Sequence, residues 1–97
     1  SVSVDDPGGS AFADVTWTIT VPDLNAVKVT VEIFVAFPTP TWTVIGTINN
    51  IRPGVAREIQ GILNAGSSVS YRVAAYTSND TRGAYAMGVV NVPGGND

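Results

Sequence analysis

The side chains that most often carry out chemistry in proteins are scarce in this chain of 97 residues, which contains no histidine and no cysteine. Without an imidazole or a thiol, neither a Ser–His nor a Cys–His nucleophile pair can be assembled. Lys28 is a candidate base, but its position within an alternating segment predicts a solvated charge on an outer strand face. Paired carboxylates for glycoside hydrolysis need a cleft, which a single small domain rarely supplies. We therefore expect that the protein is not an enzyme.

Metal binding would have to rely on oxygen ligands, because the softer metals prefer histidine and cysteine. An all-oxygen calcium site is the remaining possibility. Asp5 and Asp6 lie in a glycine-rich turn and Asp80 lies in another loop, but their spacing matches no calcium-binding loop. We interpret these aspartates as turn-forming residues, and we expect neither a metal nor a cofactor.

The charge of the chain argues against a nucleic-acid partner, and its hydrophobic pattern argues against membrane insertion. The formal net charge is −3, and the five basic residues are scattered along the sequence, whereas a nucleic-acid-binding protein needs a basic stripe. No apolar run approaches the roughly 20 residues that a membrane-spanning helix requires. We expect no nucleic-acid partner and no membrane insertion. The five basic residues are Lys28, Arg52, Arg57, Arg72 and Arg82.

The hydrophobic pattern has the period of two that is typical of β-strands. Residues 13–21 and 27–35 alternate apolar and polar side chains, and turn-forming proline, glycine and asparagine follow such segments. Similar segments cover 42–48, 55–63, 69–76 and 84–92, and a short strand opens the chain. Residues 56–63 alone would tolerate a helix. These patterns predict an all-β protein with about seven strands.

The size of the chain predicts one domain over residues 1–97, with a core in 13–92 and flexible ends at 1–10 and 93–97. With no cysteine, this core must hold through packing, which the 44% content of hydrophobic residues allows. Pro7 and Pro93, with glycines beside them, are expected to end the outermost strands and to limit pairing with other chains.

From residue 13 to about residue 92 the chain resembles the fibronectin type III family. Trp17 resembles the core tryptophan of the family's second strand, and residues 42–47 resemble its C′ strand. The best match is Leu63, followed by a short turn and by Tyr71. In the family, a tyrosine at the start of strand F donates its hydroxyl hydrogen bond to backbone upstream, a tyrosine corner. The turn departs from the family's Pro–Gly pattern, because it reads Asn–Ala–Gly in residues 64–66.

This resemblance implies a seven-stranded antiparallel immunoglobulin-like β-sandwich of fibronectin type III type. It also implies that four residues belong to the structural core rather than to a functional site. These are Trp17, Leu63, Tyr71 and Val73.

Two groups of residues are candidates for binding. The first is the loop between the last two strands, because exposed loops on a rigid sandwich often carry recognition. In some fibronectin type III domains this loop bears an Arg–Gly–Asp adhesion motif, but here Ala84 follows Arg82 and Gly83, so integrin binding is not implied. Asn79 begins an N-glycosylation triplet. The loop comprises Thr77, Ser78, Asn79, Asp80, Thr81, Arg82 and Gly83.

The second group consists of aromatic residues. Phe34 and Tyr76 fall on the outward faces of two strands that are neighbours in the fibronectin type III fold, and Phe37 and Trp42 lie nearby in sequence. They could form a surface that binds a protein or stacks against a sugar. The alternative, which we favour, is that they are cross-strand pairs that only stabilise the sheet.

We therefore expect a noncatalytic module that acts as a structural spacer or adhesion domain of an extracellular or virion-surface protein. A polar surface built from threonine, serine, asparagine and glycine, with only 13% charged residues, favours this location. One alternative is a module that binds carbohydrate or protein through its loops and an aromatic sheet face. Another is a self-assembling structural or decoration protein of a viral particle. Neighbouring domains or subunits would attach through the termini.

Overall fold

A computed structural model describes residues 1–94 of the chain, and within this range the protein is all-β, with seven strands and no helix. This confirms the predicted class and strand number. The strands are β1 (Val2–Val4), β2 (Phe12–Ile19), β3 (Ala26–Val35), β4 (Thr41–Asn49), β5 (Arg57–Asn64), β6 (Ser68–Thr77) and β7 (Ala86–Asn91).

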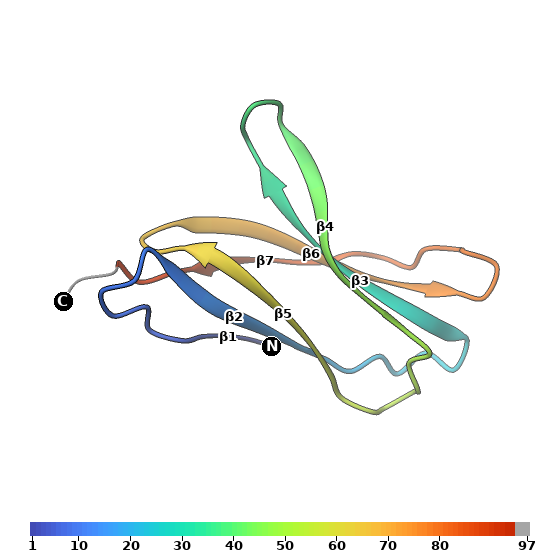
Figure 1. Cartoon of the computed structure of the whole chain (residues 1–97). Coiled ribbons are helices and arrows are strands. Elements are labelled where there is room, and N and C mark those ends of the chain that lie inside the picture. The colour runs from blue at the N-terminus through green and yellow to red at the C-terminus, as the bar shows by residue number, and fades with distance from the viewer. Residues whose placement is uncertain (95–97) are drawn as a thin grey trace.

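The strands form two antiparallel sheets, one with the order β1-β2-β5 and the other with the order β4-β3-β6-β7 (Figure 1). Alternate side chains of both sheets point to a shared interior, where Val15 and Trp17 of β2 meet Val29 and Val31 of β3. An arrangement of two sheets around one core is compatible with a β-sandwich.

The core is built from the residues that the alternation of β2 and β3 places on one face. Trp17 is 1% exposed, and Leu63 on β5 is also buried. Tyr71 and Val73 on β6 are half-buried and pack against this core. The edge of the Tyr71 ring meets the Trp17 ring with a centroid separation of 5.9 Å. Side chains from both sheets therefore enclose Trp17.

The two sheets come closest where β4 passes over β5. A Cβ atom built on Gly46 would collide with the side chain of Ile59, which is buried in the core. Glycine is thus required at this position so that Ile59 can fill the space between the sheets.

The hairpin of β3 and β4 departs from the body of the molecule. The register of the pair shifts between Val31 and Glu32, and such irregularities bend a strand and increase its twist. Beyond Ile33, the last residue of β3 that pairs with β6, the hairpin projects away from the rest of the molecule (Figure 1). Its tip carries Phe37, whose exposed fraction is 84%.

The side chain of Tyr71 does not form the predicted tyrosine corner. Tyr71 is the fourth residue of β6 rather than its first, and no hydrogen bond of its hydroxyl is found within residues 1–94. Instead the ring lies against Gly88 of β7, where a Cβ would be 2.5 Å from the hydroxyl oxygen. The prediction is wrong because the ring points into the space between the sheets rather than back along the chain.

The structure describes the N-terminal end of the chain fully and the C-terminal end only in part. Val2 to Val4 pair with β2 from Trp17 to Val15. Part of the predicted flexible end at 93–97 lies outside the described residues, which stop at Gly94. In the described part of the chain, no helix is long and apolar enough to cross a membrane.

Replacing Gly46 with alanine should destabilise the fold. The new methyl group must displace Ile59, and overpacking of this kind costs about 1–3 kcal/mol of unfolding free energy. Urea denaturation measures this loss. Gly9→Ala is the control, because no atom lies within 4 Å of a Cβ at that position. Equal unfolding free energies for the two variants would contradict the close approach of β4 and β5.

Replacing Tyr71 with phenylalanine should leave the stability nearly unchanged. Among residues 1–94 the hydroxyl has no hydrogen-bond partner to lose, so the unfolding free energy should change by less than about 0.5 kcal/mol. A loss of about 1 kcal/mol in the same urea experiment, the usual net contribution of a hydrogen bond, would show that Tyr71 does form a tyrosine corner.

Candidate functional site

The outer face of the four-stranded sheet brings together three of the candidate binding residues, Phe34, Trp42 and Arg82, with residues that the sequence did not single out. The register places Arg72 of β6 between Glu32 of β3 and Met87 of β7. Glu32 in turn pairs with Val44 of β4, and the neighbouring residue Phe34 pairs with Trp42. We call the cluster of Glu32, Phe34, Trp42, Val44, Arg72, Arg82 and Tyr85 the ladder face.

A stack of cations and aromatic rings crosses this face. The guanidinium carbon of Arg72 lies 4.3 Å from the ring centroid of Trp42 and 4.1 Å from that of Tyr85. Arg82 lies 4.0 Å from the same Tyr85 ring. Such contacts contribute about 0.5–1 kcal/mol at exposed sites and more where water is excluded. The stack therefore holds β4, β6 and the start of β7 together from the outside.

The centre of the stack is an ion pair. A nitrogen of the Arg72 guanidinium donates a hydrogen bond of 2.9 Å to a carboxylate oxygen of Glu32. The Glu32 side chain is only 9% exposed, and that of Arg72 is 22% exposed. Two charges are thus held under the surrounding rings, and each one offsets the desolvation of the other.

Exposed apolar side chains surround this polar centre. Phe34 is 40% exposed and Val44 is 53% exposed on one side of it. Met87 and Val89, which lie on the same face of β7, are 65% and 58% exposed. An apolar patch with a desolvated arginine at its centre has the composition of a protein interface, in which aromatic residues, methionine and arginine are enriched.

The four aromatic residues predicted as a surface do not form one cluster. Phe34 and Trp42 are in contact, with ring centroids 5.4 Å apart. Tyr76 lies at the other end of the face beside Lys28, which is six residues before Phe34 on β3 and so about 20 Å away. Phe37 lies at the tip of the hairpin. The expected pair of Phe34 and Tyr76 is therefore absent, because their register positions are far apart.

The loop of residues 77–83 folds tightly on itself next to the face. Asn79 accepts hydrogen bonds from the hydroxyls of Thr77 and Thr81, and Asp80 has a φ angle of 65°. The ends of the loop are also held, because the amide of Gly83 donates to Ala75 over 2.8 Å. The loop thus presents a fixed shape, in which Arg82 reaches the stack. Ser78 is exposed.

Lys28 is not the freely solvated charge that its alternation predicted. Its ammonium group lies 3.2 Å from a carboxylate oxygen of Asp80 and 4.6 Å above the Tyr76 ring. The side chain is 29% exposed. The predicted outward direction of the Lys28 side chain was correct. The loop that carries Asp80, however, folds over the strand and supplies a carboxylate that pairs with the ammonium group.

Sequence reasoning missed four members of the ladder face, which are Glu32, Val44, Arg72 and Tyr85. One signal was present, since Arg72 shares the outward parity of Tyr76 on its strand and Glu32 shares that of Phe34. Alternation along a strand tells only on which face of the sheet each side chain lies. Contact across the sheet depends on the register between strands, which alternation does not supply.

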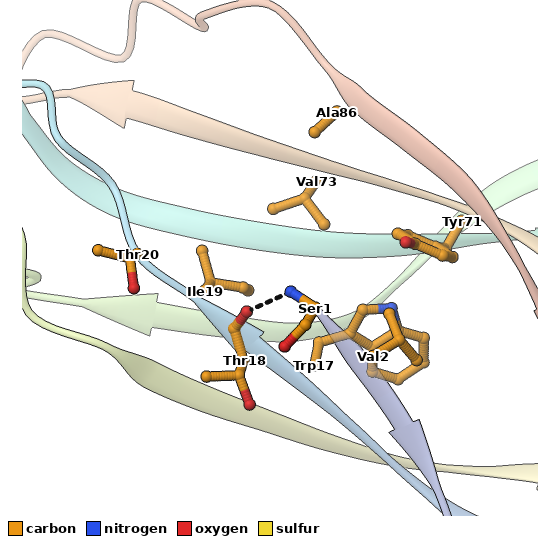
Figure 2. Close-up of a pocket in the computed structure, with 9 residues that line it drawn as sticks. All are labelled: Ser1, Val2, Trp17, Thr18, Ile19, Thr20, Tyr71, Val73 and Ala86. Atoms are coloured by element: carbon orange, nitrogen blue, oxygen red, sulfur yellow. Dashed lines mark hydrogen bonds between the residues drawn. The ribbon is translucent and has the colours of Figure 1, made fainter.

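A cleft of about 190 Å³ opens between the two sheets on the side of β1 and β7 (Figure 2). Its walls are mostly apolar, and the backbone nitrogen of Ser1 donates to the carbonyl of Thr18 at one side. The buried indole nitrogen of Trp17 has no hydrogen-bond partner within residues 1–94. The cleft has no carboxylate in its lining, which comprises Ser1, Val2, Trp17, Thr18, Ile19, Thr20, Tyr71, Val73 and Ala86.

A second depression, on the outer face of β2 and β5, contains two carboxylates. Asp5 and Asp14 line it together with Thr16, Gln60, Gly61 and Ile62. Among residues 1–94, no group of three or more carboxylate, imidazole or thiol side chains is placed to hold a metal ion. Asp6 has a turn-forming contact, because its carboxylate accepts a hydrogen bond of 2.8 Å from the amide of Gly8.

Comparisons of the chain with protein-family models, with curated proteins and with solved structures find no match. What the protein does must therefore be argued from the ladder face and its surroundings.

Truncating Arg72 should destabilise the protein far more than truncating Arg82. Arg72→Ala leaves the Glu32 carboxylate buried without its cation, and breaking such a pair costs about 3–5 kcal/mol when both charges are fully buried. Because Arg72 is partly exposed, we expect about 2–3 kcal/mol of lost unfolding free energy. Arg82→Ala removes only a cation–π contact and should cost less than about 1 kcal/mol. Similar urea midpoints for both variants would show that the buried ion pair contributes little.

Proposed function

We propose that this chain is a noncatalytic β-sandwich module of the fibronectin type III type, which binds a protein partner through the ladder face and the projecting β3–β4 hairpin. The partition into three and four strands supports the type, as does the position of Trp17 on the second strand. The absence of a tyrosine corner at Tyr71 is a departure from the family pattern.

The observation that carries this function is the exposed apolar surface around a desolvated ion pair. Phe34, Phe37 and Val44 are 40%, 84% and 53% exposed and all belong to one hairpin. Leaving such side chains in water is unfavourable by about 25 cal/mol for each Å² of apolar surface. Clusters of this kind on a folded domain mark contact sites, and the projection of the hairpin makes its tip accessible to a partner.

A protein partner fits the ladder face better than a carbohydrate. Sugar binding uses aromatic rings with a free face, whereas cations cover a face of Trp42, Tyr76 and Tyr85. Phe34 is engaged edge-on with Trp42. The Trp42 and Tyr85 rings are therefore engaged in the stack and the Tyr76 ring is engaged with Lys28, and the surface they leave open is an apolar one of the kind that proteins bury.

The setting we propose is the surface of a cell or of a virion, where the module acts in adhesion or as a spacer that presents its hairpin. The composition supports this setting, because the surface polarity comes from threonine, serine, asparagine and glycine rather than from charge. The compact loop of residues 77–83 gives the module a second contact region beside the ladder face.

Photo-cross-linking at the hairpin tip tests the partner proposal. A Phe37→p-benzoylphenylalanine variant, expressed in its native setting and irradiated, should form one defined adduct that mass spectrometry identifies as a protein. Adding Phe34→Ser should reduce the yield by at least about tenfold, since truncating an interface hot spot costs about 2 kcal/mol or more.

The matched control is Ile62→p-benzoylphenylalanine, because Ile62 is a strand residue of the other sheet with an exposed fraction of 67%. Equal adducts from positions 37 and 62 would contradict a specific site on the hairpin. A glycan array that binds the wild-type protein but not Trp42→Ala would replace the protein partner with a carbohydrate.

A further inference from the structure

The free edge of β7 is the least protected strand edge of the described chain. Strands at sheet edges are usually guarded by charges, prolines, bulges or short length. β1 has only three residues, β5 carries Arg57 and Glu58, and β4 follows Pro40 and pairs irregularly with β3. β7 has none of these features, because its sequence Ala–Met–Gly–Val–Val–Asn is uncharged and its register with β6 is continuous.

The hydrogen-bonding groups on this edge can be assigned from the ladder. The amide of Val92 donates to the carbonyl of Ser67 over 2.8 Å, so residue 92 points its backbone groups towards β6. Alternate residues of an antiparallel strand point the same way. Backbone groups of Gly88 and Val90 are thus used within the sheet, whereas those of Met87, Val89 and Asn91 point away from β6. Pro93 lies beyond the strand and does not block them.

We propose that the occupant of this edge is the β7 strand of a second copy, paired antiparallel about a two-fold axis at Gly88. In this register Met87 of each copy lies opposite Val89 of the other copy. The outward backbone groups of these two residues are then in hydrogen-bonded positions. The pairing covers two side chains that are 65% and 58% exposed in the single chain. It joins two four-stranded sheets into one sheet of eight strands.

Identical copies meet without electrostatic repulsion along this line. The net charge of −3 on each chain opposes any self-association, but β7, with no charge over its six residues, adds no local repulsion to it. The strand is also self-complementary, because apolar residues face apolar residues and glycine faces glycine at the axis. A charged partner strand would lack this match, which favours a second copy.

The dimer contact is the backbone edge of β7, whereas the proposed partner contact is the ladder face and the β3–β4 hairpin. Either proposal can therefore be wrong while the other holds. Wild-type protein should sediment as a dimer at about 100 μM, and Val89→Lys should raise the dimer dissociation constant by at least about tenfold. Ile62→Lys, an exposed apolar strand residue on the other sheet, should leave the constant unchanged. Trp42→Ala, which weakens the ladder face, should also leave it unchanged.

Cysteine cross-linking checks the register independently of any effect of lysine on folding, since the natural chain has no cysteine. A mixture of Met87→Cys and Val89→Cys should form a disulfide-linked dimer on mild oxidation, and a mixture of Ile62→Cys and Val89→Cys should not. A wild-type monomer at about 100 μM, or an equally strong dimer of a folded Val89→Lys variant, would overturn the proposal. Equal cross-linking in both mixtures would overturn the register.

Discussion

The packing of Trp17 between the two sheets is the interaction on which the rest of the structure depends. The chain has no disulfide that could hold the sheets together, so apolar burial must do so. Truncation of a buried tryptophan costs about 3–5 kcal/mol, a large part of the roughly 5–15 kcal/mol that stabilises a domain. Other residues serve the same packing. Tyr71 and Ile59 fill the shared interior, and Gly46 leaves room for Ile59.

Once the interior holds the sheets in place, the outer face of the larger sheet becomes a second organised layer. Arg72 extends across Glu32 to reach Trp42 on one side and meets Tyr85 on the other. One hydrogen bond joins the two charges, the Arg72 Nε is buried without a partner within residues 1–94, and the Trp42 and Tyr85 rings cover the guanidinium. As a result the face combines a polar centre with exposed apolar side chains, and the proposed protein contact rests on this combination.

Much of the fold could be predicted from local pattern alone. Alternation in residues 13–21 and 27–35 marked two strands and the inward direction of Trp17, Val29 and Val31. Leu63 was correctly placed in the core. Tyr71 does pack against the core as predicted, but the predicted tyrosine corner was wrong, because a tyrosine near a turn can point along the chain or into the interior. The space left by Gly88, which is 17 residues away, decides between these.

The sequence by itself determined the β class, the approximate strand segments and the buried faces of the strands at 13–21 and 27–35. These properties follow from residue types and from a period of two, which are local. Only the tertiary structure decided that Trp42, Arg72 and Tyr85 stack, that Phe34 and Tyr76 lie far apart and that the edge of β7 is open. Those facts depend on register between strands distant in sequence, where a shift by one residue exchanges the faces and every cross-strand partner.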